Sequence, residues 1–578
     1  MKEFMLLLTA CIGYFNMTFA AATAKADVNF DMYKKAFTER LWKIYPEWAS
    51  SIGYHKYDAI LVIPNKANRE KELLFTKEEL KRLNHFSLDS LSDLNKIDFH
   101  LIDNFLKSSI WQINTLKGYE WNPSMYNVGE SFAYILNENY APLSKRINSI
   151  YSKLKNVPAY YEAAKVNIKN PSNEHLQLAI QQNEGALSVF ENDFIDSLKE
   201  LSLTPELKKE YFKRNDTAIA AIKSYIKFLQ DFKNEHPRSF RLGSELYAEK
   251  FNYEIQSQYS VQEIYEAAEK RKDYLHTEMF KLTTQLWPKY FGNTPMPPTQ
   301  LSAIKRMIDT ISVQHVERAN FQTEIEKQLP ALIKFVREKN LLYLDPNKPL
   351  KVRKEPGYMA GVAGASMSSP GPYEKNGIAY YNVGSLAGWS DEKAESYLRE
   401  YNKYVLQILN IHEAIPGHYV QLVYSNKAPS IIKSILSNGA MIEGWAVYSE
   451  LMMLENGYGN NEPEMWLLYY KWNLRSVCNT ILDISVHTKN ESKDEALDLL
   501  MNQAFQQKTE AEGKWHRVQV TSVQLTSYFT GFYEITKLRE AYKKKMGNAY
   551  KLKNFNEQFL SYGSSPVKYI RQILLSKN

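Results

Sequence analysis

The chain has 578 residues, of which 44% are hydrophobic, enough for a large buried core and for one to four domains. Lys and Arg number 72 against 65 Asp and Glu, so the net charge of +7 is small for this length. Because no basic stripe with interleaved aromatic residues accompanies this charge, the composition argues against nucleic-acid binding.

The first 26 residues are typical of an export signal. Phe4 to Met17 is mostly apolar, and Thr18 to Ala24 supplies the small residues that signal peptidase requires. The apolar run is too short to span a bilayer, and no other segment suggests a transmembrane helix. Leu8 to Cys11 also resembles a lipobox, which would make Cys11 a lipid-modified N-terminus. We therefore expect an exported protein, periplasmic or secreted, with a membrane-anchored lipoprotein as the alternative.

The mature chain is not expected to form an internal disulfide bond. Once the signal is removed, Cys478 is the one remaining cysteine, so stability must come from the size of the core. We expect residues 27–578 to form one large domain, with two lobes of about 27–340 and 341–578 as an alternative.

Helical periodicity dominates the sequence. Near the start, apolar residues fall three or four positions apart, as on the buried stripe of a helix, at Phe30, Tyr33, Phe37, Leu41 and Ile44. The same pattern predicts helices within 94–116, 143–169, 174–200, 204–234, 260–287, 300–338, 394–425, 430–456, 463–488, 493–510 and 520–547. We therefore predict a mainly α fold.

Residues 341–389 interrupt this pattern. Short strand-like runs at 342–344, 350–352 and 378–381 surround a stretch rich in Gly, Ser and Pro, GVAGASMSSPGPY. The pattern predicts a small β-sheet with a long loop. The edge of such a sheet could bind an extended peptide by strand addition, and a purely structural connector is an equally good interpretation.

HEAIPGHY, residues 412–419, places two imidazoles and a carboxylate within seven residues. Two metal-binding histidines on one helix are usually four positions apart, whereas His412 and His418 are six apart and would diverge by about 120° on a regular helix. Pro416 lacks the N–H that would continue the helix, and Gly417 tolerates unusual backbone angles. We therefore expect a bulge that swings His418 back toward His412.

A second helix supplies the remaining acids. Glu443 follows His418 by 25 positions, and Glu450 shares its helix face seven positions later. Two His, one acid and an open position are the requirements of a catalytic zinc site, with Glu413 as the base that takes a proton from water. Gly444 allows a close approach of this helix, which favours Glu443 as the ligand. Glu450 would then hydrogen-bond a ligating His, although the two acids could exchange roles.

These motifs carry a resemblance. HEAIPGHY followed by EGWAVYSE resembles the bacterial domain-of-unknown-function family numbered 885, which is regarded as zinc-metallopeptidase-like, and the resemblance covers nearly the whole mature chain. It implies an elongated, mostly helical, bundle-like architecture with a deep central cleft, similar to angiotensin-converting-enzyme-like and thimet-oligopeptidase-like peptidases. Clefts of that type admit short peptides and exclude folded proteins.

The resemblance extends to two later segments. A stretch with Arg475, Asp483 and His487 resembles the family's R…D…H helix, and a stretch with Tyr528 and Gly531 resembles its Q…Y…G segment. The family's Gly before that His and its Pro-Gly before that Gln are absent here. By resemblance, His487 and Tyr528 would stabilise an oxyanion, and Asp483 would orient His487. Arg475 would bind a substrate carboxylate or pair with Asp483.

The sequence therefore predicts a zinc-dependent hydrolase that cleaves short peptides, with Zn²⁺ as its cofactor. Alternatives are a zinc amidase acting on non-peptide or cell-wall amides, and a catalytically inactive metal-binding module. The sequence predicts no oligomeric state.

Overall fold

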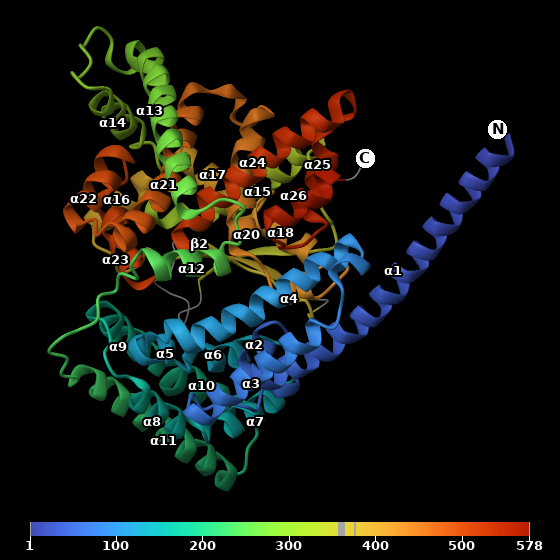
Figure 1. Ribbon diagram of the computed structural model, residues 1–578. Helices are drawn as coiled ribbons and strands as arrows, with labels where there is room; N and C mark the ends of the chain where they lie inside the picture. Colours follow the sequence, from blue (N-terminus) through green and yellow to red (C-terminus); the bar gives the residue numbers. More distant parts are fainter. Residues whose placement is uncertain (1, 356–364, 375–376, 577–578) are drawn as a thin grey trace. The chain divides into compact units, whose positions relative to one another are not determined.

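The computed structural model describes residues 2–355, 365–374 and 377–576, with side chains from residue 23 onward (Figure 1). The chain forms two compact units. The first comprises Met1–Pro171, Leu176–Pro237 and the short insert Ser430–Leu436, and the second comprises Ser172–His175, Arg238–Pro429 and Ser437–Asn578. Most of the second unit therefore begins at about residue 238, whereas the two-lobe alternative placed a boundary near residue 340.

Helices build the first unit. They are α1 (Lys2–Ile44), α2 (Pro46–Ser51), α3 (Lys66–Leu83), α4 (Asp93–Trp111), α5 (Gly118–Trp121), α6 (Gly129–Asn137), α7 (Leu143–Leu154), α8 (Val157–Asn167), most of α9 (Asn173–Ser188), α10 (Phe194–Lys199), α11 (Pro205–Gln230) and α19 (Ile432–Ile435). The apolar stripe predicted on α1 is buried, with Phe30, Phe37 and Leu41 all 0% exposed.

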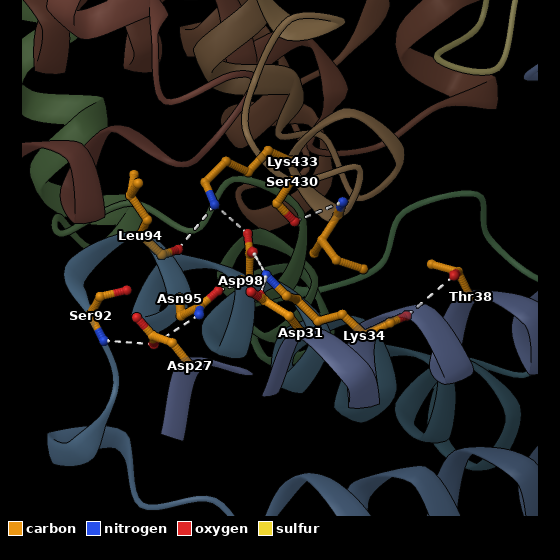
Figure 2. Close-up of polar contacts among 11 residues, drawn as sticks. Asp27, Asp31, Lys34, Thr38, Ser92, Leu94, Asn95, Asp98, Ser430 and Lys433 are labelled. Atoms are coloured by element: carbon orange, nitrogen blue, oxygen red, sulfur yellow. Dashed lines mark hydrogen bonds and ion pairs between the residues drawn. The ribbon is translucent and has the colours of Figure 1, made fainter. Parts of the chain in front are cut away.

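A buried carboxylate ties α1, α4 and α19 together in this unit (Figure 2). Asp98 of α4 forms ion pairs with Lys34 of α1 (2.6 Å) and with Lys433 of α19. Lys433 also donates to Leu94 O at 3.0 Å. Burial lowers the pKa of Lys433, and Asp98 opposes that shift. Lys34 also pairs with the exposed carboxylate of Asp31 at 2.8 Å, whereas Lys433 is fully buried and, among the described residues, forms its ion pair with Asp98 alone.

The second unit is also mainly helical. Its helices are α12 (Ser244–Glu254), α13 (Val261–Phe291), α14 (Gln300–Ile311), α15 (Phe321–Glu338), α16 (Asp391–Glu400), α17 (Lys403–Glu413), α18 (His418–Ser425), α20 (Gly439–Glu455), α21 (Pro463–Thr488), α22 (Lys493–Asp498), α23 (Lys508–Val520), α24 (Ser527–Met546), α25 (Leu552–Leu560) and α26 (Val567–Ser576). The core helix is α21, which contacts α13, α17, α20, α23 and α24 (Figure 1).

Two glycines let α20 and α24 approach each other at backbone distance. A Cβ built on Gly444 would lie 2.3 Å from the backbone carbon of Gly531, and one built on Gly531 would lie 1.8 Å from Ala440 O. No side chain fits at either position without separating the helices. The close approach that Gly444 suggested is therefore confirmed, and Gly531 is its counterpart on α24.

The sheet has three strands within the described residues, in the order β1 (Leu350–Lys354), β3 (Ala379–Val383) and β2 (Ala365–Ser368). β1 pairs with β3 in parallel and β2 pairs with β3 antiparallel. The mainly α class and the small sheet within 341–389 are confirmed. Residues 342–344 form a loop rather than a strand, and β2 arises inside the Gly- and Ser-rich stretch.

Several predicted helices are divided. The region 394–425 contains three helices and 300–338 contains two, because single helices end at Glu400, Glu413 and Ile311. Among the described helices, none combines the length and apolar character needed to cross a membrane. The elongated outline and central cleft implied by the resemblance remain predictions.

Asp98→Asn should lower the free energy of unfolding of the first unit by about 3–5 kcal/mol, because it leaves the buried ammonium of Lys433 without its carboxylate partner. Denaturant unfolding followed by circular dichroism measures the effect on the first transition. Asp103→Asn is the matched control on α4, since its partner Lys107 is 52% exposed and the pair should contribute less than about 1 kcal/mol. Equal effects of the two variants would contradict a structural role for Asp98.

Candidate metal centre

A sharp chain reversal places the two histidines of the motif beside each other. α17 ends at Glu413 and α18 begins at His418, so the segment is two helices with a break rather than the single bulged helix expected. The N–H of Gly417 donates to Ile411 O at 3.0 Å. A Cβ on Gly417 would lie 1.8 Å from His412 O, so only glycine allows the chain to fold back this tightly.

Three donor atoms converge at this reversal. Oε2 of Glu443 lies 3.8 Å from Nε2 of His412 and 3.4 Å from Nε2 of His418. Donors bound at about 2.1 Å to a tetrahedral ion are about 3.4 Å apart, so the spacing suits zinc. Among the described residues, Oε2 of Glu443 has no hydrogen-bond partner although it is buried. Such an orphaned oxygen between two imidazoles fits a bound cation.

Glu413 lies beside these donors and competes for the position of third ligand. One ligand atom each from His412, Glu413 and His418 lie within 4.8 Å of one another, a grouping that could also hold a metal ion. We favour Glu443 because its Oε2 reaches both imidazoles at shorter distances. Its side chain is 20% exposed, so the site keeps an approach for water or substrate.

Glu450 takes the supporting position that its spacing suggested. Its Oε1 accepts a hydrogen bond from His412 Nδ1 at 2.7 Å and another from Trp472 Nε1 at 3.0 Å. Because Nδ1 is the donor in this bond, Nε2 of His412 is the nitrogen that faces Glu443 and would bind a metal once it is deprotonated. Both acids of α20 thus reach the same imidazole from opposite sides.

The charges of this cluster are strongly coupled. Burial acts to lower the pKa of His412, but the carboxylates of Glu443 and Glu450 raise it to about 10. Burial acts to raise the pKa of Glu443, but His412 and His418 hold it well below its usual range. Burial raises the pKa of Glu413, and His418 and His412 oppose that shift. A proton on His412 must therefore leave before its Nε2 binds a metal.

Tyr528 lies at this centre, together with an arginine that the sequence did not single out. The Tyr528 ring stacks near His412, with centroids 6.5 Å apart and planes at 22°. Nη2 of Arg517 donates to Gln524 Oε1 at 2.7 Å and to the Tyr528 oxygen at 3.4 Å. Arg517 forms no ion pair with any residue that the structure describes. A lone arginine on α23 gives no signal of this role in the sequence.

His487 and Asp483 do not occupy the positions that the resemblance implied. The Nε2–H of His487 donates to Val518 O and Thr521 O, both at 2.9 Å, so it faces backbone at the end of α23. Asp483 accepts from the hydroxyl of Tyr247 (2.7 Å) and from the backbone N–H of Val523 (2.9 Å). The expectation that Asp483 orients His487 toward an oxyanion is therefore wrong.

Both residues instead support the connection from α23 to α24. Asp483 holds two backbone N–H groups, those of Val523 and Leu525, while Val523 adopts a φ of +69°. Such a φ is strained for a β-branched residue and persists only where surrounding contacts impose it. The connection carries Gln524 and leads directly into Tyr528. We conclude that Asp483 and His487 of α21 position the connection that carries Gln524 and leads to Tyr528.

Arg475 pairs with an acid other than Asp483. Its guanidinium lies 2.6 Å from Glu510 and over the Trp472 ring, at 4.8 Å from the centroid. Burial, together with the nearby Arg475, lowers the pKa of the neighbouring Lys514 to about 7. The expected pair with Asp483 is wrong, and binding of a substrate carboxylate by Arg475 would require it to leave Glu510.

One family model and two solved structures match this chain over most of its length. A family model described as "Bacterial protein of unknown function (DUF885)" matches residues 46–574. A Shewanella oneidensis protein named "a putative lipoprotein of unknown function" is 51% identical, with a TM-score of 0.85 over 94% of this chain and 99% of that chain. A Colwellia psychrerythraea protein named "the putative lipoprotein" has the same fold at 16% identity, with a TM-score of 0.78 over 95% and 98%. No curated protein matches.

Gly417→Ala should abolish metal binding, because the new Cβ would collide with the backbone oxygens of Ile411 and His412. Elemental analysis of the purified variant should find far less than one metal ion per chain. Gly513→Ala is the control, since nothing lies within 4 Å of a Cβ there, and it should retain the metal. Normal metal content in Gly417→Ala would show that the reversal is not required.

Glu450→Gln should weaken metal affinity by about 10–100-fold, because the hydrogen bond that orients His412 loses its charge. Competition with a chromophoric chelator measures the affinity. Among the described residues, Glu455 on the same helix forms its ion pair with Arg539 alone, so Glu455→Gln should leave affinity unchanged. If the two variants bind metal equally well, Glu450 does not support His412.

Proposed function

This chain belongs to the DUF885 family of bacterial proteins of unknown function, and we propose that it is a zinc-dependent peptidase acting on short peptides. One observation carries the proposal: Oε2 of Glu443 is shared between Nε2 of His412 and Nε2 of His418, with the Glu413 carboxylate beside them. Two imidazoles, one carboxylate and an adjacent acid are the donor set of a catalytic rather than a structural zinc site.

Each residue has a defined task in this proposal. His412, His418 and Glu443 would hold Zn²⁺, which when bound supplies a Lewis acid that lowers the pKa of water and polarises a carbonyl. Glu413 takes a proton from the attacking water and passes it to the leaving amine. A structural metal site has no use for a base at that position, which favours an active enzyme over a binding module.

Tyr528 is the proposed donor to the oxyanion. Its hydroxyl accepts from Arg517 and therefore keeps its own O–H free to donate. A neutral phenol stacked near His412 can stabilise negative charge on the carbonyl oxygen as it develops. Arg517 holds that hydroxyl in place, and the loop supported by Asp483 holds both residues.

Glu413→Gln should keep about one zinc per chain and lose about 10²–10⁴-fold in turnover, because the amide cannot accept the proton. The assay is zinc-loaded protein with a library of short quenched fluorogenic peptides, and mass spectrometry maps the products. Glu392→Gln, on the exposed face of α16, is the control and should retain full activity. Full turnover by Glu413→Gln would contradict the role of Glu413, and cleavage of non-peptide amides alone would replace peptidase with amidase.

We also propose export with a lipid anchor on Cys11. The lipoprotein names of both structural relatives favour the lipobox alternative at Leu8 to Cys11. Cells fed an alkyne-tagged fatty acid should yield labelled wild-type protein in the membrane fraction. Cys11→Ser should lose the label, and Cys478→Ser, which changes the buried cysteine, should keep it. Labelling that persists in Cys11→Ser would contradict the proposal.

A further inference from the structure

The strand β1 has an open edge. Within the described residues it has a strand neighbour on one side only, β3. The N–H of Glu355 donates to Val383 O, and Pro349 O accepts from Ala379 N–H, so the odd-numbered residues bond toward β3. In a parallel ladder the alternate residues direct their N–H and C=O groups the other way. The backbone groups of Leu350 and Val352 therefore face outward from the sheet.

A cavity of about 710 Å³ lies along this edge. Three consecutive residues of β1, 350 to 352, line it, so the cavity follows this strand along its length. The opposite wall is apolar and comes from α15 through Leu329 and Ile333, and from α18 through Val420 and Val423. The volume lies in the range of ligand-binding pockets, about 300–1,000 Å³.

Polar contacts hold the walls of this groove in place. The hydroxyl of Tyr419 donates to Lys348 O at 2.6 Å, and that of Tyr424 donates to Tyr343 O at 3.0 Å. Lys427, two residues beyond the end of α18, forms an ion pair with Asp345. Two contacts from α18 and one from the residues just after it thus hold the loop before β1, so the groove is a built feature of the second unit.

The rim of the groove carries an excess of positive charge. The charged residues that line it are four cations, Arg337, Lys348, Lys351 and Lys427, and two acids, Glu326 and Asp345, so the lining has a formal net charge of +2. Lysine at an open strand edge discourages pairing between two copies of the same chain. The same charges attract an occupant that is acidic.

We propose that this groove binds an extended, acidic and apolar peptide segment, which adds to β1 as a further strand. Main-chain groups at Leu350 and Val352 would bond the peptide backbone, and the walls from α15 and α18 would hold its apolar side chains. The groove is distinct from the metal centre, because His418 faces Glu443 while Tyr419 and Val420 face the groove. Binding there needs neither metal nor catalysis.

The probe is the pentapeptide Glu-Val-Leu-Val-Glu with an N-terminal fluorescein, titrated with the full chain carrying Glu413→Gln in the presence of EDTA. Fluorescence anisotropy should show saturable binding that weakens as salt is added. Val423→Trp fills the groove and should weaken binding at least tenfold, and Lys351→Glu should weaken it and reduce the salt dependence. Val313→Trp, a matched change at a residue 55% exposed and outside the groove, should leave binding unchanged.

A second measurement leaves the groove unaltered and reports on strand addition itself. Two further probes carry N-methyl groups, one on the odd-numbered and one on the even-numbered amides of the peptide. Because only alternate peptide N–H groups face β1, one of these probes should lose binding and the other should keep it. Equal binding by both registers, or full affinity in Val423→Trp, would overturn the proposal. So would a fluorescent fatty acid that occupies the groove while the peptide does not bind.

Discussion

The candidate metal centre depends on the close contact between Gly417 and the last turn of α17. His412 lies in the last turn of α17 and His418 begins α18, and the backbone of Gly417 lies so close to His412 O that no side chain fits between them. Without this contact, imidazoles six positions apart would point in different directions. Helices α20 and α24 also require glycine at their contact. Gly444 and Gly531 let the two backbones touch, which brings Tyr528 of α24 close to Glu443 of α20. Backbone contacts at three glycines thus set where every proposed reacting group lies.

Around this centre, the buried helix α21 carries polar groups within an otherwise apolar core. Trp472 orients Glu450, Arg475 pairs with Glu510, and Asp483 caps the loop before Tyr528. A buried polar group is costly unless it is bonded, so these residues constrain the positions of their partners. The helix therefore contributes rigidity to the centre, while no residue of it is proposed as a metal ligand.

The sequence allowed the mainly α class, the small sheet and the cluster of His412, His418, Glu443 and Glu450 to be predicted, because each depends on local spacing. A spacing of seven positions places both acids on one face of α20, so a helix that packs against that face meets both of them. The roles of His487 and Asp483 depend on contacts with residues about 30 to 40 positions away, which no local pattern records. Arg517 could not be predicted for the same reason, and residues 342–344 lack a pairing strand despite their β-prone composition.

The most direct test of a zinc centre built by this chain reversal is anomalous diffraction at the zinc edge from crystals of the full chain. The account predicts one zinc peak about 2.1 Å from Nε2 of His412, Nε2 of His418 and a carboxylate oxygen of Glu443, with Glu413 unbound beside it. A zinc-supplemented crystal with no peak there, or a peak whose third protein ligand is Glu413, would contradict it.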